Sequence, residues 1–261
     1  MKKRYACATT LFLMLLAVGG AHATMKTPVK FDIEPDAIHI GQSYNGTKIT
    51  ITGQIPSDTD AVVRLMGKGE DLLLKKKGKA LGILWMNMNT ILFHDCPPIF
   101  MMDIPKNLAP VSAEETKKWE DLGLGLTAIE RQIKISPEQK DETALFDEFI
   151  KLKKKEGKYL TCYDAIRYSD DNGRTKRFSA TIALPAGLKS GDYSVEMFEV
   201  KGGGIVDKGR RNIRADQVGL PKALSSLAFD HSLLYGIMAV IVALAAGLVT
   251  GMIFKGGKGA H

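Results

Sequence analysis

The sequence has only three cysteines, and none of them stands in a C-x-x-C pair. This absence excludes the thioredoxin-type redox motif, paired zinc-binding cysteines and the attachment site of a c-type haem. Cys7 lies in an N-terminal segment that we expect to be removed, which leaves Cys96 and Cys162. An even pair in an oxidising compartment favours a disulfide between these two, and two unpaired buried thiols are the alternative.

The chain also lacks a basic domain, although its net charge is +7. Five basic residues lie in the two terminal segments: Lys2, Lys3, Arg4, Lys255 and Lys258. No Asp or Glu precedes Asp32 or follows Asp230, so the body keeps 31 basic and 29 acidic residues. Nucleic-acid-binding domains normally carry a basic excess throughout, so we expect no nucleic-acid partner.

Only one hydrophobic run is long enough to cross a bilayer. Residues 233–254 (LLYGIMAVIVALAAGLVTGMIF) contain no charge and no proline, and only Tyr235 and Thr250 are polar. As a helix with about 1.5 Å rise per residue, the run spans roughly 33 Å. A helix inside a soluble domain is rarely apolar on every face, so we predict a transmembrane helix at 233–254, preceded by a tether at 216–232.

The N-terminus has the features of a secretory signal peptide at residues 1–23. A basic start precedes the short apolar segment 10–18, and Ala21-His22-Ala23 supplies the small residues of a cleavage site before Thr24. A retained anchor is the alternative. Lysines follow the C-terminal helix directly, so we expect an exported ectodomain at 24–215 and a cytoplasmic stub at 255–261. In a bacterium, this is an inner-membrane protein with a periplasmic body.

Short alternating apolar runs on both sides of residues 112–157 predict β-strands. Asn45-Gly46 and the run 170–173 (DDNG) are turn signals. The pattern Gly191-x-Tyr193-x-Val195 is typical of immunoglobulin-like sandwiches, in which the tyrosine hydroxyl caps a corner. We therefore predict a mainly β protein, an immunoglobulin-like antiparallel β-sandwich with a helical insertion. Two small β-domains joined by the helical segment are the alternative.

Residues 112–157 carry helix signals. Ser112 with Glu115 forms a capping box, and Ser136-Pro137 predicts a second helix start with proline at its first position. Gly157 ends this second helix. Its apolar face is predicted from five residues: Leu145, Phe146, Phe149, Ile150 and Leu152.

The membrane helix contains small residues at every fourth position, namely Ala239, Ala243, Gly247 and Gly251. Such a face lets a second helix approach closely in lipid, which predicts a homodimer or a complex with another transmembrane protein. The alternative is that Ala and Gly are simply common in membrane helices.

A basic cluster, Lys75, Lys76, Lys77 and Lys79, is a second candidate. Charge runs are usually solvated, which makes a hairpin tip the plain interpretation. The functional interpretation is a contact with anionic headgroups, a protein partner or a small anion.

Catalytic and metal-binding patterns are weak. His94-Asp95-Cys96 has suitable residue types, but three consecutive strand residues cannot all face one metal ion. Asp170-Asp171 is better explained by turn propensity than by acid–base chemistry. We predict no metal, no cofactor and no enzymatic activity.

Four segments carry a family resemblance: 43–47 (SYNGT), the lysine-rich run 75–78 leading into 81–87 (LGILWMN), 184–193, and the helix start 234–236. Together they resemble an uncharacterised proteobacterial family of alphaproteobacterial-type transmembrane proteins. The resemblance implies a role beside a sulfite-exporter-type permease, and it carries no catalytic residue. We therefore expect a periplasmic accessory or binding subunit of a small-anion exporter, with a periplasmic sensor or ligand-binding module as the alternative and a membrane-tethered enzyme as the least favoured.

Overall fold

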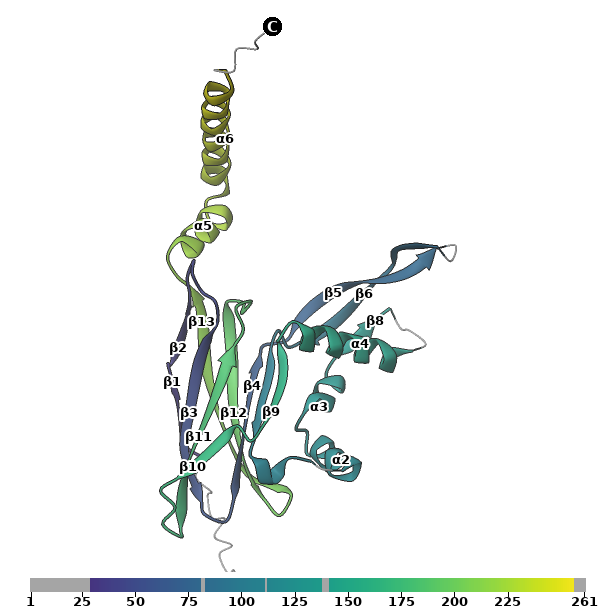
Figure 1. Ribbon diagram of the computed structural model, residues 1–261, viewed down its shortest axis with the longest axis vertical. Helices are drawn as coiled ribbons and strands as arrows, with labels where there is room; N and C mark the ends of the chain where they lie inside the picture. The colour runs from purple at the N-terminus through teal and green to yellow at the C-terminus, as the bar shows by residue number, and fades with distance from the viewer. Residues whose placement is uncertain (1–28, 81–82, 111, 138–140, 256–261) are drawn as a thin grey trace, which may run out of the picture.

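The computed structural model describes residues 29–80, 83–110, 112–137 and 141–255 (Figure 1). The predicted signal peptide and the cytoplasmic stub beyond Lys255 lie outside these residues. The protein is mainly β, as predicted, and one long apolar helix leaves the body at its C-terminal end.

The strands form three sheets. The four-stranded sheet has the order β1 (Phe31–Glu34), β3 (Thr47–Pro56), β11 (Thr175–Leu184) and β10 (Ile166–Ser169). The six-stranded sheet has the order β2 (Ala37–Ile40), β13 (Gly204–Gln217), β12 (Gly191–Lys201), β4 (Asp60–Gly67), β7 (Phe100–Ile104) and β9 (Tyr159–Tyr163). The three-stranded sheet has the order β5 (Glu70–Ala80), β6 (Leu84–Cys96) and β8 (Lys134–Ser136).

The four- and six-stranded sheets pack face to face as a sandwich. Alternation along β11 buries Phe178, Ala180 and Ile182 against residues of the opposite sheet such as Val63 and Val195. We call this cluster the sandwich core. The predicted corner is present, because the Tyr193 hydroxyl donates a hydrogen bond of 2.7 Å to the Lys189 carbonyl.

The six-stranded sheet differs from a purely antiparallel one. Strand β2 pairs with β13 in parallel, and β9 pairs with β7 in parallel. The long connection that precedes β9 contains the helices, and such a crossover can return the chain in the parallel direction, which a tight turn cannot do.

A third layer covers the outer face of the six-stranded sheet, and the sequence patterns did not predict it. Strand β7 is buried at every residue, as expected for a strand covered on both faces. Its outward residues Phe100 and Met102 join a second cluster with Phe93, Phe146 and Phe149. We call this cluster the outer core.

The third layer consists of the three-stranded sheet and four helical segments: η2 (Lys106–Leu108), α2 (Ala113–Asp121), α3 (Leu126–Glu130) and α4 (Glu142–Lys155). The predicted cap of α2 is present, with the Glu115 N–H 3.2 Å from the Ser112 hydroxyl. The predicted start at Pro137 is wrong, because Ser136 ends β8 and α4 begins at Glu142.

Helix α4 buries Phe146, Phe149 and Ile150, as predicted, but its fourth buried residue is Lys153, and Leu152 is exposed. Lys153 lies seven residues after Phe146 and therefore on the same helix face. Its aliphatic stem packs like an apolar side chain, which explains why a pattern of apolar residues misses it.

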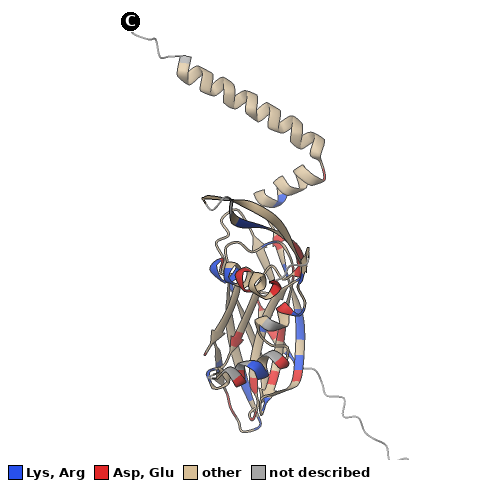
Figure 2. Cartoon of the chain, turned by 90° about the vertical axis from the view of Figure 1, so that its right-hand side faces the viewer, with Lys and Arg blue, Asp and Glu red and all other residues tan. Residues whose placement is uncertain are grey.

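Two helices follow β13. Helix α5 (Leu220–Phe229) lies in the predicted tether, and α6 (Ser232–Lys255) contains the predicted membrane span. Figure 2 shows charged residues of both signs distributed over the body, whereas residues 232–254 of α6 include none.

Candidate functional site

Helix α6 is the one described helix long and apolar enough to cross a membrane, with a candidate span at Ser232–Phe254. None of this span is buried within the described chain. Its polar Thr250 hydroxyl donates to the Ala246 carbonyl at 2.8 Å, so this group is satisfied inside the helix. The helix is therefore built to face lipid or another membrane helix.

The predicted small residues Ala239, Ala243, Gly247 and Gly251 are all exposed on α6. With 3.6 residues per turn, Gly236 falls on the same face, seven residues before Ala243. A Cβ atom added at Gly236, Gly247 or Gly251 would meet nothing within 4 Å. The face is open along its length in the described chain, and we call it the small-residue face.

The basic cluster lies on the β5–β6 hairpin. Lys75, Lys76 and Lys77 are exposed on β5, and the backbone places Lys79 on the same strand opposite Trp85. Strand β8 supports this hairpin only at Leu92, Phe93 and His94. The remainder of the hairpin projects past α4 and β8 (Figure 1).

Arg64 lies on β4, the strand that precedes this hairpin, and it has a structural role. Its guanidinium lies 2.6 Å from the Glu196 carboxylate and donates to the Gly123 carbonyl at 2.8 Å. It also lies 4.9 Å from the centre of the Phe198 ring. These contacts fasten the helical layer to the six-stranded sheet.

Cys96 and Cys162 are free thiols in the structure, without the bridge that their number suggested. Cys96 is buried in the outer core, the cluster that also contains Tyr159. Cys162 lies three residues after Tyr159 on β9, and strand alternation turns it to the opposite face. Burial raises the pKa of the Cys96 thiol to about 12 and also raises that of Cys162.

The side chains of His94, Asp95 and Cys96 have different surroundings and do not converge on one point. His94 Nδ1 lies 3.0 Å from an Asp71 carboxylate oxygen, and the Asp95 carboxylate accepts a hydrogen bond of 2.8 Å from Gln132. Asp95 has a φ of 56°, which rotates it out of the strand. Within the described residues, no group of three or more His, Cys, Asp or Glu side chains is placed to hold a metal.

A cleft of about 210 Å³ lies where the hairpin base, α4 and the start of β12 meet. Lys153 lines it, with its ammonium 5.6 Å from the Phe149 ring centre and 5.8 Å from that of Tyr159. Burial, and then the charge of Lys158, lower the pKa of Lys153. The other charged groups are paired, Lys189 with Glu70 at 2.5 Å and Lys158 with Glu156 at 2.8 Å.

Asp103 is a second buried ionisable group that the sequence patterns missed. It lies on β7 opposite Cys162 and is 3% exposed. One of its carboxylate oxygens has no hydrogen-bond partner in the described chain. Burial raises the pKa of Asp103 to about 7. An apolar pattern gives no signal for a single carboxyl placed inside a sheet.

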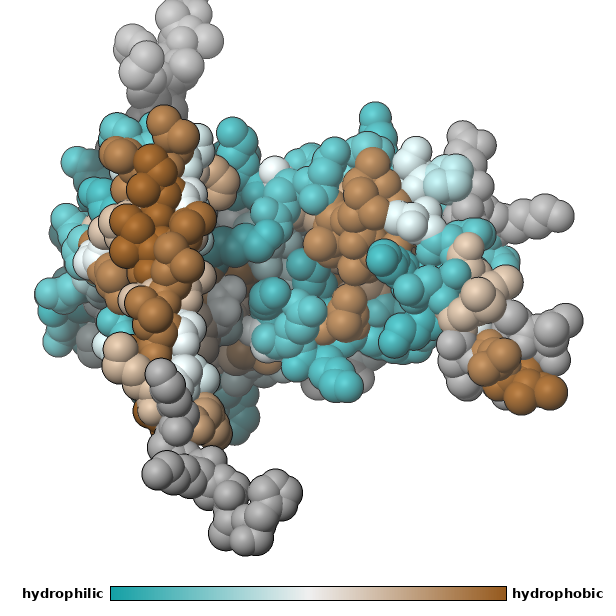
Figure 3. Space-filling model, turned by 90° about the horizontal axis from the view of Figure 1, so that it is seen from above, coloured by the Kyte–Doolittle hydropathy of each residue, from teal (hydrophilic) through white to brown (hydrophobic). Residues whose placement is uncertain are grey.

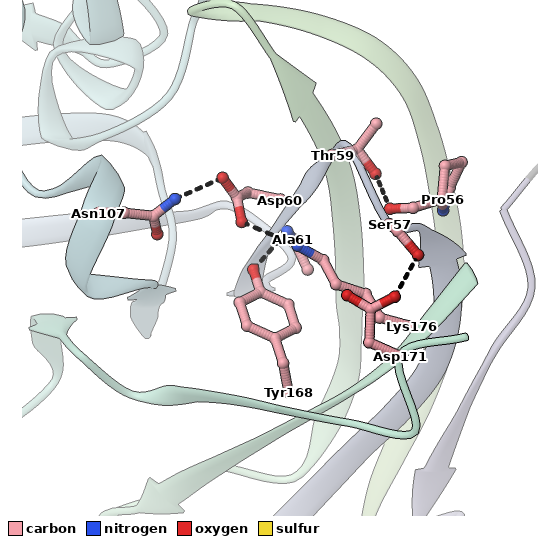
Figure 4. Close-up of polar contacts among 9 residues, drawn as sticks. All are labelled: Pro56, Ser57, Thr59, Asp60, Ala61, Asn107, Tyr168, Asp171 and Lys176. Atoms are coloured by element: carbon pink, nitrogen blue, oxygen red, sulfur yellow. Dashed lines mark hydrogen bonds and ion pairs between the residues drawn. The ribbon is translucent and has the colours of Figure 1, made fainter. Parts of the chain in front are cut away.

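Polar contacts at the end of the sandwich far from α6 form a satisfied network (Figure 4). Asp60 accepts from Asn107 at 2.6 Å and pairs with Lys176 at 3.4 Å. The Lys176 ammonium lies 4.3 Å from the centre of the Tyr168 ring, whose hydroxyl accepts from the Ala61 N–H at 3.0 Å. This network joins η2 to the sandwich and has the character of a structural brace.

The Asp170–Gly173 turn at the same end is closed by its own side chains. Asp171 accepts from the Ser57 hydroxyl at 2.6 Å and from the Gly173 N–H at 2.9 Å. These two bonds, the hydroxyl first, lower the pKa of Asp171. Asp171 therefore stabilises a turn, which agrees with the turn propensity in the sequence, and Asp170 forms an exposed ion pair with Arg177.

Comparison with known proteins gives one result for nearly the whole described chain. No curated protein matches the sequence. The family model described as "Putative transmembrane protein (Alph_Pro_TM)" matches residues 28–256. This range contains both cores, the hairpin and α6. The chain is thus a membrane-anchored, mainly β protein, and it belongs to the Alph_Pro_TM family of transmembrane proteins.

Proposed function

We propose that this protein is a non-enzymatic accessory subunit of a bacterial inner membrane. Its β body lies in the periplasm, its C-terminus in the cytoplasm, and α6 packs against a multi-pass protein such as a small-anion exporter of the sulfite type. The positive residues that flank α6 on its C-terminal side support this orientation.

The observation that carries the proposal is the asymmetry of α6. Its small residues gather on one face, and the rest of its circumference is occupied mainly by large side chains. In lipid, helices associate through close packing, and a glycine-rich face allows backbones to approach. A plain anchor has no need of such an arrangement, and the described chain offers no second membrane helix to cover it.

The same face suits two kinds of partner. If the partner is a helix of a multi-pass protein, this chain is one subunit of a mixed complex. If the partner is a second copy of this chain, the complex is a homodimer. A multi-pass partner supplies the further membrane helices that the described chain does not contain, and we favour it over self-association.

The test is purification of the full-length protein in mild detergent, compared with a Gly247→Ile, Gly251→Ile variant. The matched control is Ala245→Ile with Val249→Ile, which adds bulk to the opposite side of α6. We expect a multi-pass membrane protein to co-purify with the wild type and the control, and to be lost from the glycine variant.

Two results contradict the proposal. If only an untagged copy of this chain co-purifies, the face serves a homodimer. If every form emerges alone and monomeric, the helix is only an anchor.

A second function, a periplasmic ligand-binding or sensor module, is favoured by the cleft at Lys153. Among the described residues, no carboxylate pairs with the buried ammonium of Lys153, which therefore offers a site for a small oxyanion. Calorimetric titration of the full-length protein with sulfite and with inorganic phosphate tests this function. Binding that is lost in Lys153→Met and kept in Lys151→Met supports it, and the absence of heat with the wild type opposes it.

A further inference from the structure

We infer that the free part of the β5–β6 hairpin is a second membrane contact, which binds the surface of an anionic bilayer beside α6. The free part comprises residues 75–80 and 83–90, beyond the stretch that β8 supports. This inference needs only the anchoring of the chain in a membrane and is independent of the proposed protein partner.

The free part exposes large apolar side chains. Ile83 is 83% exposed, Leu84 66%, Met86 51% and Met88 53%. Apart from the hairpin, the described chain exposes apolar side chains to this extent mainly in α5 and α6. A soluble surface rarely gathers such residues without a partner.

The pairing of the strands explains how this apolar surface arises. Leu74 pairs with Ile91 on the face that covers the outer core, and Gly78, four residues further along β5 and paired with Met86, lies on that same face. Met88 lies against Gly78, since a Cβ added there would be 2.6 Å from the Met88 Cγ. The core-facing side of the hairpin thus continues past the body, where the described chain no longer covers it.

Charge accompanies the apolar surface, and it is of one sign. Residues 72–94 contain four lysines, Lys75, Lys76, Lys77 and Lys79, and no Asp or Glu. The body as a whole is nearly balanced, so this segment departs strongly from its surroundings. Lysines beside apolar side chains are the combination by which proteins bind anionic lipid surfaces.

The hairpin lies at the end of the body that faces the membrane helix. Figures 1 and 2 both place it at the end of the body from which α5 and α6 leave. Seen from that end in Figure 3, apolar surface covers α6 and appears again at the right-hand edge, where the hairpin ends. A chain already anchored by α6 holds the hairpin close to the bilayer, so even a weak contact is occupied.

The test uses the full-length protein with an environment-sensitive fluorophore at Asn87→Cys, in a Cys7→Ser, Cys162→Ser background. Cys96 is retained because it is buried. The protein is placed in nanodiscs of phosphatidylcholine, or of an equal mixture of phosphatidylcholine and phosphatidylglycerol. A second label site, Arg174→Cys, reports from the opposite end of the body.

We expect the Asn87 label to shift to the blue in the anionic discs and to be quenched by lipids that carry a headgroup nitroxide. The Arg174 label remains water-like in both discs. Each lysine at an anionic surface contributes a factor of about five, so loss of three lysines lowers the contact equilibrium about 100-fold, and Lys75→Glu, Lys76→Glu, Lys77→Glu lowers it further because the new carboxylates are repelled. The matched control, Lys151→Glu, Lys154→Glu, Lys155→Glu on α4, leaves the shift unchanged.

Salt gives a check that leaves the lysines of the hairpin unchanged. At about 1 M salt the screening length falls to about 3 Å, and the blue shift of the Asn87 label should diminish. An Asn87 label that stays water-like in anionic discs overturns the inference. So does a shift that survives the hairpin substitutions, or one that appears only when another membrane protein is added to the discs.

Discussion

Two hairpins of this protein are built in opposite ways. The β10–β11 hairpin closes through Asp171 and Asn172, whose side chains accept hydrogen bonds from backbone N–H groups of the turn. Its strands bury Ile166 and Phe178 in the sandwich core. The β5–β6 hairpin buries only its base, and its outer part exposes four large apolar residues beside a row of lysines.

The difference follows the position of each hairpin relative to the membrane helix. The polar, self-satisfied hairpin lies far from α6, and the apolar, basic one lies near it (Figure 1). Exposed apolar surface is thus concentrated at one end of the molecule. The β10–β11 hairpin stabilises the fold, and the β5–β6 hairpin is the one that we propose contacts the bilayer.

The largest expected effect on stability is in the β10–β11 hairpin. Phe178 is fully buried, and its ring lies against Gly53, where a Cβ would be 2.6 Å from the ring. Phe178→Ala should lower the free energy of unfolding by about 3–5 kcal/mol. Urea unfolding of the full-length protein in detergent, followed by circular dichroism of the strands, measures it. A loss below about 1 kcal/mol would contradict the assignment of Phe178 to the core.

The next effect concerns the buried carboxyl of Asp103. Because its pKa is raised to about 7 in the folded protein, the folded state holds a proton that the unfolded state has already released. Stability should therefore fall as pH rises from about 4 to about 7, and level off above that. The full effect is up to about 4 kcal/mol.

Asp103→Asn should remove this fall and leave the variant more stable than the wild type at pH 8. Unfolding curves at pH 5 and pH 8 for both proteins measure the difference. A wild-type stability that does not decrease over this interval would show that the carboxyl is solvated.

A smaller effect is expected at the brace of Figure 4. Asp60→Ala removes two hydrogen-bonding contacts and leaves Lys176 half-buried without its carboxylate. The cost should be about 1–3 kcal/mol in the same urea assay. Arg177→Ala serves as the control, because its ion pair with Asp170 is exposed on both sides and should contribute little.

The smallest effect on stability is expected at the free hairpin. Leu84→Ser with Met86→Ser should change the free energy of unfolding by less than about 0.5 kcal/mol, since neither side chain is packed in a core. The same substitutions should weaken the membrane contact of the hairpin. A loss of several kcal/mol would place these residues in the fold and end the contrast between the two hairpins.

Local patterns in the sequence predicted the local features of the structure. Alternation identified β11, the Gly191-x-Tyr193 pattern identified the capped corner, and the uninterrupted apolar run identified α6. Each of these signals depends on residues close together in the chain. The family resemblance was also confirmed over residues 28–256.

The remaining features depend on pairings between distant segments, which spacing alone does not specify. The apolar run in β7 is compatible with one covered face or two, and only the placement of Phe146 and Phe149 decides between them. Strand β8 is three residues long and too short for a periodic signal. The candidate groups Lys153 and Asp103 are charged residues at buried positions, where composition predicts apolar ones.

The account depends most on the claim that the small-residue face of α6 meets another membrane helix. The most direct measurement places a photo-crosslinking amino acid at Val240, beside Gly236, Ala243 and Gly247 on that face, or at Ile241, which points away. After irradiation of intact membranes, we predict an adduct to a multi-pass membrane protein from position 240 and none from position 241. Equal adducts from both positions, or none from either, would contradict the account.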